Sequence, residues 1–525
     1  MRMKTVFKLL GIIIVLLGGH FLLSSFISSA PLVPVPFRFP WRQAGLTERQ
    51  AATHLLSRFT YGAMPGQVDM VLQQGLENWW AQQLAADLPD DSLEMLLRPY
   101  DALQLSNEQV VNLYPRVGQV AKMAIRDGVV DKDSIKTDRK EYRQMIRAYM
   151  DEKGYKPEQD LFRQFICQKI LRAACSKNQL QEVMTDFWFN HFNVSITKND
   201  CAEFIPAYER DVIRPNALGK FGDLLEKTAK SPAMLYYLDN FSSSAALPVG
   251  VQDSGKKGRG LNENYAREVM ELHTLGVDGG YTQADVTEAA RVLTGWTVYP
   301  MNDNVQRLIT RFSPDQLARR GFVHDGDFLF NANRHDKGEK IFLGHVFPAG
   351  GGYDEGVELL DMLAHHPSTA KFICRKIAIR FVSDEPPQSL VDKMAKTFLA
   401  KSGDIRQVLI TMVTAPEFWS PAAVREKTKS PFELAIGAVR SLRAEVDRPY
   451  PLYTWITRMG EKKYYYQAPT GFPDKGAYWV NTGSLLNRMN FGLALAEGQI
   501  EGVKVETVNP QAAGLAIGSP ENQLR

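Results

Sequence analysis

Apolar side chains recur at three- and four-residue intervals along most of the chain, beginning near Thr47. This spacing puts apolar residues on one side of an α-helix, so it predicts a helix wherever it persists for about ten residues. Such segments cover residues 47–59, 66–86, 106–126, 135–152, 158–192, 206–229, 262–275, 283–294, 355–365, 368–382, 388–400, 404–414, 431–442 and 483–498. We therefore expect a mainly α fold, built as a multi-helical globular body.

A different pattern occupies residues 321–347, where the stretches DFLF and KIFLG are short and either alternate or run apolar. Short runs of this kind between turn residues are typical of strands. The two stretches flank NANRHDKGE, in which Lys337 and Gly338 are suited to a turn. We expect one small β-hairpin inserted in the helical body.

The first thirty residues combine positive charge with a long apolar run. Three basic residues come first, the apolar run covers 9–26, and small residues follow as far as Ala30. This order is typical of an export segment. Because the run is nearly long enough to span a membrane, residues 1–30 are either a cleaved signal peptide or an uncleaved membrane anchor. Either alternative puts the body in the periplasm or on the outer face of the inner membrane, after a proline-rich linker over 31–46.

Overall charge and known motifs exclude several classes of partner and cofactor. The 62 basic and 59 acidic residues leave a net charge of +3, so no whole-protein field attracts nucleic acid. No Walker loop, GxGxxG at a strand–helix junction, HExxH or CxxCH is present, which removes support for a nucleotide, a zincin-type metal site or covalent haem. The four cysteines are compatible with free thiols or with a disulfide.

The most distinctive stretch is NENYAREVMELHTLGVDGGYTQADV, residues 262–286. On a regular helix over 262–275, His273 lies on the buried face, roughly 160° from Glu271, so the two cannot bind one metal ion. Arg267 is four residues from both Glu263 and Glu271, which favours a salt-bridged outer face over an active site. Thr282, three residues before an aspartate, predicts the start of the next helix.

Three other places carry candidate side chains, each with a structural alternative. In DFWFNHFNV, residues 186–194, His191 could be a general base and Asn190 could orient a substrate, or both could be polar members of an aromatic core. At the predicted hairpin, His335 and Asp336 could bind a metal, although a turn aspartate ordinarily bonds backbone. Asn240 ends a helix, where capping explains it as well as binding does.

Several segments together resemble one known family. They are HLLSRFTYG (54–62), DFWFNHFNV (186–194), SPAMLYYLDN (231–240), the 262–286 stretch with TGW (294–296), NRHDKGEKIFLG (333–344), HPSTAKFICRKIAIRF (366–381), APEFW (415–419), KSPFELAIGAVRSL (429–442) and APTGFPDKGAYWVNTGSLLNRMNFG (468–492). The chain is similar over these segments to the bacterial domain-of-unknown-function family numbered 1800. The resemblance implies a single body over 47–497, with 498–525 as a C-terminal tail.

The resemblance also changes how the polar face of the 262–275 helix is interpreted. The family pattern specifies its polar positions, and a merely solvated face has little need of particular residues. We therefore expect this face to line a pocket as readily as to face solvent. Family members are often encoded beside proteins of the sulfatase-like unknown-function family 1501, which implies such a protein as a partner. The polar positions are Asn262, Glu263, Asn264, Arg267, Glu268 and Glu271.

Two functions follow as hypotheses. In the first, the protein is a hydrolase or lyase acting on an envelope polymer, with Glu268 and Glu271 as acid and base and His191 assisting. A divalent metal at His335 and Asp336 is an open part of this hypothesis. In the second, the protein is a non-catalytic binding or assembly module that works with the sulfatase-like partner. The expected substrate-binding residues of the first are Asn190, Asn240, Asn262, Asn264, Arg267 and Trp296.

Overall fold

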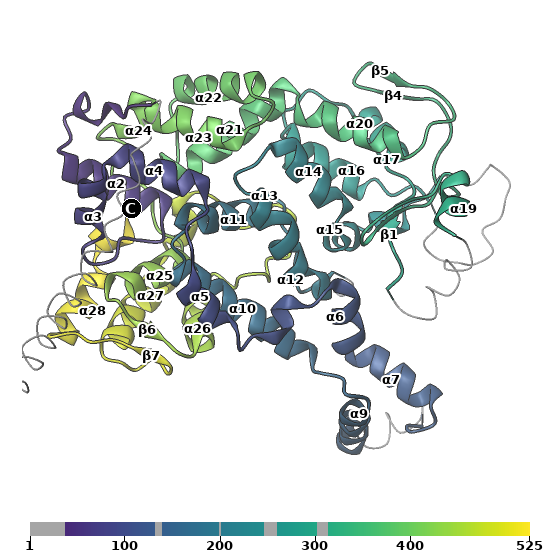
Figure 1. The fold of residues 1–525 in the computed structure, drawn as a ribbon, viewed down its shortest axis with the longest axis horizontal. Coiled ribbons are helices and arrows are strands. Elements are labelled where there is room, and N and C mark those ends of the chain that lie inside the picture. The colour runs from purple at the N-terminus through teal and green to yellow at the C-terminus, as the bar shows by residue number, and fades with distance from the viewer. Residues whose placement is uncertain (1–36, 132–138, 199–200, 246–259, 302–312) are drawn as a thin grey trace, which may run out of the picture. The chain divides into compact units, whose positions relative to one another are not determined.

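The computed structural model describes residues 37–131, 139–198, 201–245, 260–301 and 313–525, and its fold is mainly α as expected (Figure 1). The predicted export segment 1–30 and residues 31–36 of the proline-rich linker lie outside the described residues. Among the residues that are described, no helix is both long and apolar enough to cross a membrane.

The N-terminal part of the body consists of short and medium helices. Thr47 caps the first of them through a reciprocal bond with Gln50, which is why the helix begins where the apolar period begins. These helices are α2 (Glu48–Phe59), α3 (Gln67–Gln74), α4 (Leu76–Ala85), α5 (Asp91–Leu97), α6 (Asn107–Leu113), α7 (Val117–Arg126), α9 (Arg139–Lys153), α10 (Glu158–Cys175) and α11 (Gln179–His191).

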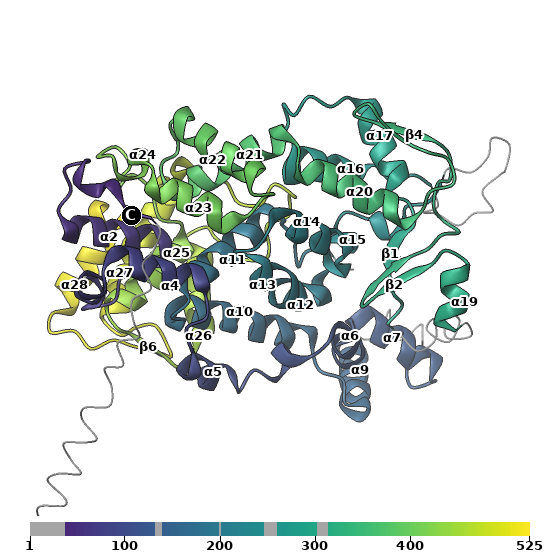
Figure 2. The same ribbon diagram turned by 45° about the horizontal axis from the view of Figure 1, so that its top comes forward.

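The middle of the chain carries the stretch that the sequence singled out. A π-helix over Tyr208–Ile213 precedes α14 (Phe221–Lys230) and α15 (Pro232–Tyr237). Next come α16 (Asn264–Glu268), a second π-helix η6 (Val269–Thr274), α17 (Gln283–Val292), α19 (Pro314–Arg319) and α20 (Tyr353–Ala364). The predicted capping of α17 by Thr282 and Asp285 is confirmed. Figure 2 shows α16 close to α17 and α20.

The C-terminal part is again helical. Its elements are α21 (Pro367–Phe381), α22 (Gln388–Ala400), α23 (Ile405–Thr414), α24 (Pro416–Trp419), α25 (Pro431–Ser441), α26 (Pro449–Arg458), α27 (Thr482–Ala496) and α28 (Pro510–Gly518). Residues 498–525, predicted as a tail, are part of this packed body. Helix α28 lies against α27, and the side chain of Arg525 is buried and donates to the carbonyl of Arg380 at 2.8 Å.

The prediction of one hairpin over 321–347 is wrong in its pairing. Strands β2 (Val323–Asp325) and β3 (Phe328–Phe330) form one antiparallel hairpin, and β1 (Trp296–Val298) pairs with the other edge of β3. Strands β4 (Lys340–Phe342) and β5 (His345–Phe347) form a second hairpin. The stretches DFLF and KIFLG therefore lie in different sheets, because the chain turns within each hairpin at glycine, Gly326 and Gly344, where φ is positive. A third, two-stranded sheet joins β6 (Glu445–Val446) to β7 (Val503–Lys504).

The four cysteines are free thiols in this structure. Cys167, Cys201 and Cys374 are buried, whereas Cys175 is exposed at the end of α10. Of the two alternatives that the sequence left open, the structure has free thiols.

Candidate functional site

The predicted active-site helix is not a regular α-helix. It is α-helical over Asn264–Glu268 and then widens into the π-helix Val269–Thr274. The hydroxyl of Thr274 donates to the carbonyl of Val269, five residues earlier, at 2.6 Å. A wheel drawn at 100° per residue therefore fails beyond Glu268, although His273 is buried as expected. Such π-helical turns occur frequently at functional sites.

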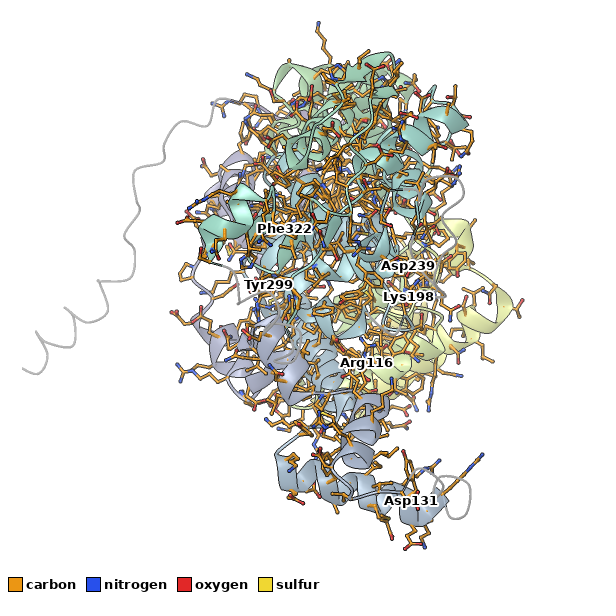
Figure 3. The ribbon with its side chains drawn as sticks, turned by 90° about the vertical axis from the view of Figure 1, so that its right-hand side faces the viewer. Arg116, Asp131, Lys198, Asp239, Tyr299 and Phe322 are labelled. Atoms are coloured by element: carbon orange, nitrogen blue, oxygen red, sulfur yellow. The ribbon has the colours of Figure 1, made fainter. Side chains whose placement is uncertain are left out.

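The asparagines at the start of this helix bond to backbone. The side-chain oxygen of Asn262 accepts the amide N–H of Asn264 at 2.9 Å, and its amide group donates to the carbonyl of Asp239 at 3.1 Å. The amide of Asn264 donates to the carbonyl of Leu238 at 3.3 Å. Asp239, in a left-handed conformation with φ of 60°, also binds Lys198 at 2.7 Å (Figure 3). The two asparagines thus fix the helix to the end of α15.

Arg267 forms one of its two predicted ion pairs. Its guanidinium lies 3.4 Å from Glu263 and donates to the side-chain oxygen of Gln283 at 2.8 Å. Glu263 in turn accepts from Thr287 at 2.7 Å. Among the described residues Arg267 makes no ion pair with Glu271, because the π-helix changes the direction of the residues that follow Glu268. The predicted salt-bridged face is therefore only half formed.

Glu268 and Glu271 are both partly buried, and within the described chain neither makes a hydrogen bond or an ion pair. Burial raises the pKa of Glu268 above its ordinary value, the negative charge of Glu271 raises it further, and Arg267 acts in the opposite direction. Two carboxyl groups that interact and are not neutralised by a cation are suited to exchanging a proton.

Two tyrosines, which the sequence did not single out, lie near this carboxyl pair. Burial raises the pKa of both Tyr237 and Tyr281, and the charges of Glu268 and Glu271 add to the effect on Tyr281. The charge of Glu268 also raises the pKa of Tyr237, which lies at the end of α15. The hydroxyl of Tyr237 donates to the carbonyl of Gln467 at 2.7 Å. The signal for both was present in the sequence, since they lie within the segments SPAMLYYLDN and GGYTQADV.

His191 does not meet the carboxyl pair. It is buried among the rings of Phe187, Trp188 and Phe192, and its Nε2 donates to the carbonyl of His273 at 3.0 Å. Burial lowers its pKa well below the ordinary value, so the ring is neutral at physiological pH. His191 is therefore a polar member of the aromatic core, which is the structural alternative to a general base.

The other predicted substrate-binding residues also have internal partners. Asn190 exchanges two hydrogen bonds of 2.8 Å with the backbone of Phe472 and lines a small cavity of about 50 Å³. Asn240 donates to the carbonyls of Leu293 and Trp296, both at 3.3 Å. Trp296 is fully buried, with its ring against Gly356. The structure therefore places Asn240 and Trp296 in the core rather than on a surface open to a substrate.

His335 and Asp336 face different partners instead of one metal site. His335 donates from Nδ1 to the carbonyl of Thr294 at 2.9 Å, and its Nε2 lies 3.1 Å from the carboxylate of Glu355. Asp336 forms an ion pair of 2.9 Å with Arg291. The two side chains are therefore held by different parts of the fold, His335 by Thr294 and Glu355 and Asp336 by Arg291. Within the described residues, no group of three or more histidine, cysteine or acidic side chains could hold a metal ion.

A buried ionic network joins α11 to α10 and to residues 463 and 464, and the sequence did not predict it. Asp186 binds Lys463 at 2.9 Å and Lys169 at 3.3 Å. Glu209 binds Lys169 at 3.3 Å and accepts from the hydroxyl of Tyr464 at 2.8 Å. These residues are up to 295 positions apart in the chain, so periodicity alone could not bring them together. Through Lys463 and Tyr464, the network connects this part of the chain to α11 and to the π-helix Tyr208–Ile213.

Comparison with known proteins supports the resemblance seen in the sequence. The family model of DUF1800, described as a protein of unknown function, matches residues 54–523. The match includes most of the segment 498–525 that was expected to lie outside the family body. A search of curated proteins and a search of solved structures each find no match.

Proposed function

The chain belongs to the DUF1800 family, whose description assigns no reaction, and we propose from its site that it is a hydrolase or lyase acting on a polymer of the cell envelope. Glu268 and Glu271 carry the reaction in this proposal. The observation that supports it is the raised pKa of half-buried Glu268 beside Glu271, with no cation bound to either carboxyl group.

The two carboxyl groups divide the work as acid and base. In hydrolysis, protonated Glu268 gives its proton to the leaving oxygen, while ionised Glu271 takes a proton from the attacking water. In elimination, ionised Glu271 removes a proton from carbon, and Glu268 again protonates the leaving oxygen. Both schemes need one protonated and one ionised carboxyl group, and burial together with the negative charge of Glu271 favours Glu268 as the protonated one.

The position of the pair on the surface agrees with a polymeric substrate. Glu268, Glu271 and Tyr281 are all partly exposed, so a long chain could cross them without entering an enclosed cavity. Tyr281 supplies a hydroxyl group and a ring face of the kind that binds sugar or peptide units. The basic and apolar residues 1–30 support export, which would bring the body to the periplasm or the outer face of the inner membrane.

The reaction is tested by incubating the purified full chain with isolated peptidoglycan and, separately, with envelope polysaccharide. We expect soluble fragments to appear. New reducing ends identify hydrolysis, and unsaturated sugar ends identify elimination. A complete lack of fragments from both materials, with and without added divalent metals, would contradict the proposal.

A second candidate function is supported by a different surface. Helices α27 and α28 border an apolar cavity of about 740 Å³, and three of the residues that line it, Leu485, Met489 and Leu515, are 40%, 50% and 62% exposed. Exposed apolar patches of this kind mark protein-interaction surfaces. We propose, as the alternative to catalysis, that this groove docks the sulfatase-like protein of unknown-function family 1501.

Co-purification of the two proteins after co-expression tests this alternative. Met489→Ser and Leu515→Ser should abolish co-purification. Val277→Ser is the matched control, because Val277 is 68% exposed but lies away from the groove. Co-purification that survives both groove substitutions would contradict docking at this site.

A further inference from the structure

A second large cavity, of about 620 Å³, lies among α3, α4, the end of α10 and the end of α25. Its volume is within the range of sites that bind small organic ligands. No acidic side chain lines it, whereas three cationic residues do, namely Lys177, Arg440 and Arg443. The cavity shares no lining residue with the carboxyl pair on α16 and η6.

Arg440 contributes a buried positive charge to the wall of this cavity. The side chain is buried, with 3% of the residue exposed, and lies in the cavity wall. Its guanidinium donates to the carbonyls of Gly62 and Ala174, both at 2.7 Å, and to Gln67 at 3.4 Å. These bonds use three of the five N–H groups of the guanidinium. All three acceptors are neutral, so the positive charge is not balanced.

Several other arginines with little exposure in the described chain, unlike Arg440, have a carboxylate nearby. Arg214 and Arg380 form ion pairs with buried glutamates. Arg58 has no ion pair within 4.0 Å, yet the nearby charges of Glu426 and Glu433 still favour its charged form. The charge of Glu433 acts on Arg488 in the same way.

Among the described residues, no carboxylate has this effect on Arg440. Burial lowers its pKa to about 10, and the described group that opposes the shift is the thiol of Cys175. Because a buried charge without a counter-charge is costly, an anion in the cavity would stabilise this arrangement.

The remaining walls favour a ligand with an apolar body. Trp79, Met64, Met70 and Leu88 supply apolar surface. Arg443 also lines the cavity and is exposed, with one bond of 2.8 Å to the carbonyl of Pro65. Arginine binds carboxylate, sulfonate or phosphate oxygens through two parallel N–H groups.

We propose that this cavity binds an amphipathic organic anion, whose charged group lies against Arg440 and Arg443 and whose apolar body covers Trp79 and the two methionines. This site is separate from the acid–base pair and does not depend on the proposed reaction. The ligand class is a small molecule with one anionic group and an aromatic or aliphatic body.

Two fluorescent probes that differ in the anionic group test this assignment with the full chain. The anionic probe is 1-anilinonaphthalene-8-sulfonate, and the neutral probe is N-phenyl-1-naphthylamine. We expect Arg443→Gln to weaken sulfonate binding about tenfold, the loss of one charge-assisted contact, while binding of the neutral probe changes less than twofold. Arg443 is exposed, so this variant should keep the fold, which circular dichroism and the thermal midpoint will verify.

Cys175 supplies a second readout in the same cavity, because it is the exposed cysteine and the other three are buried. The sulfonate probe should slow its reaction with N-ethylmaleimide, and this protection should be lost in Arg443→Gln. Met489→Ser, in the α27–α28 groove, controls for probe bound there. Equal sulfonate binding by wild type and Arg443→Gln, loss of binding in Met489→Ser, or no binding at all would each overturn the proposal.

Discussion

At the scale of single residues, the state of Glu268 depends on its neighbour. Burial and the charge of Glu271 both raise the pKa of Glu268. Replacing Glu271 by glutamine removes one of these causes and leaves the other. We therefore predict that the pKa of Glu268 is above its ordinary value in the wild type and moves down, but not fully back, in Glu271→Gln. Carbon-13 NMR of labelled glutamate carboxyl groups measures both values.

A matched control separates this interaction from a general effect of charge. Glu263 is on the same helix face, but its carboxylate is already held by Arg267, Gln283 and Thr287. Glu263→Gln should leave the pKa of Glu268 where it is in the wild type. An equal decrease in both variants would show that Glu271 is not the specific neighbour.

Glu433 belongs to a second buried ionic cluster, in which it pairs with Arg380 and Arg525. Burial by itself raises its pKa, but the charges of Arg380 and Arg525 outweigh burial and hold the pKa at about 2. Glu433→Gln leaves these two buried cations without their carboxylate, so we expect a loss of about 3–5 kcal/mol in the free energy of unfolding. Urea denaturation at neutral pH measures it. Glu385→Gln, which removes an exposed ion-pair partner, should remain close to wild type.

The same residue predicts how stability depends on pH. A carboxyl group whose pKa is lower in the folded state stabilises the protein above its unfolded pKa, near 4.5 here, and loses that contribution as the pH falls toward 2. Wild-type stability should therefore fall across this range. In Glu433→Gln the fall should be smaller, because this titrating group is absent.

Individual side chains were the hardest part of the site to predict from the sequence. Helical spacing correctly predicted that His273 is buried and that Glu263 pairs with Arg267. It could not predict that Asn240 and Trp296 bond within the core, because their partners come from other segments of the chain. Tyr237 was overlooked for the same reason, since only tertiary packing brings α15 beside α16.

At the scale of elements, the apolar period predicted helices reliably and strand pairing poorly. Helices have a local cause, hydrogen bonds between neighbouring turns, so the local pattern suffices. The pairing of β3 with β1 joins Phe330 to Trp296 across 34 positions, and three-residue strands contain too little pattern to specify it. The π-helix after Glu268 was missed because composition does not distinguish it from an α-helix.

The contact between α20 and β1 gives a prediction at this scale. A Cβ atom at Gly356 would lie 2.4 Å from the ring of Trp296, which is fully buried and has no room to move. Gly356→Ala should therefore lower the free energy of unfolding by about 1–3 kcal/mol, despite the higher helix propensity of alanine. Thermal unfolding followed by circular dichroism is the measurement.

Gly222, in α14, is the matched control for that substitution. A Cβ there would meet Ala364 at 3.5 Å, an ordinary van der Waals contact. Gly222→Ala should raise stability by about 0.5–1 kcal/mol through helix propensity alone. If both variants changed stability in the same direction, the proposed contact with Trp296 would not explain the first result.

At the scale of the whole molecule, the segment 498–525 packs against the rest of the helical body. It contributes β7 to the third sheet, packs α28 on α27, and places Arg525 2.7 Å from Glu433. A chain that ends at residue 497 should lose at least about 5 kcal/mol, comparable to the whole stability of many domains. We expect it to elute as aggregate in size-exclusion chromatography. Val508→Ala, at a fully exposed position in the same segment, should behave as wild type.

The central claim is that Glu268 and Glu271 together carry acid–base chemistry on an envelope polymer, and fragment release by the carboxyl variants tests it most directly. We predict that Glu268→Gln and Glu271→Gln each reduce the rate of fragment release at least 100-fold while keeping the thermal midpoint of the wild type. Glu263→Gln, with its carboxylate already bound, should retain most of the activity. Fragment release by Glu268→Gln and Glu271→Gln at the wild-type rate would contradict the account.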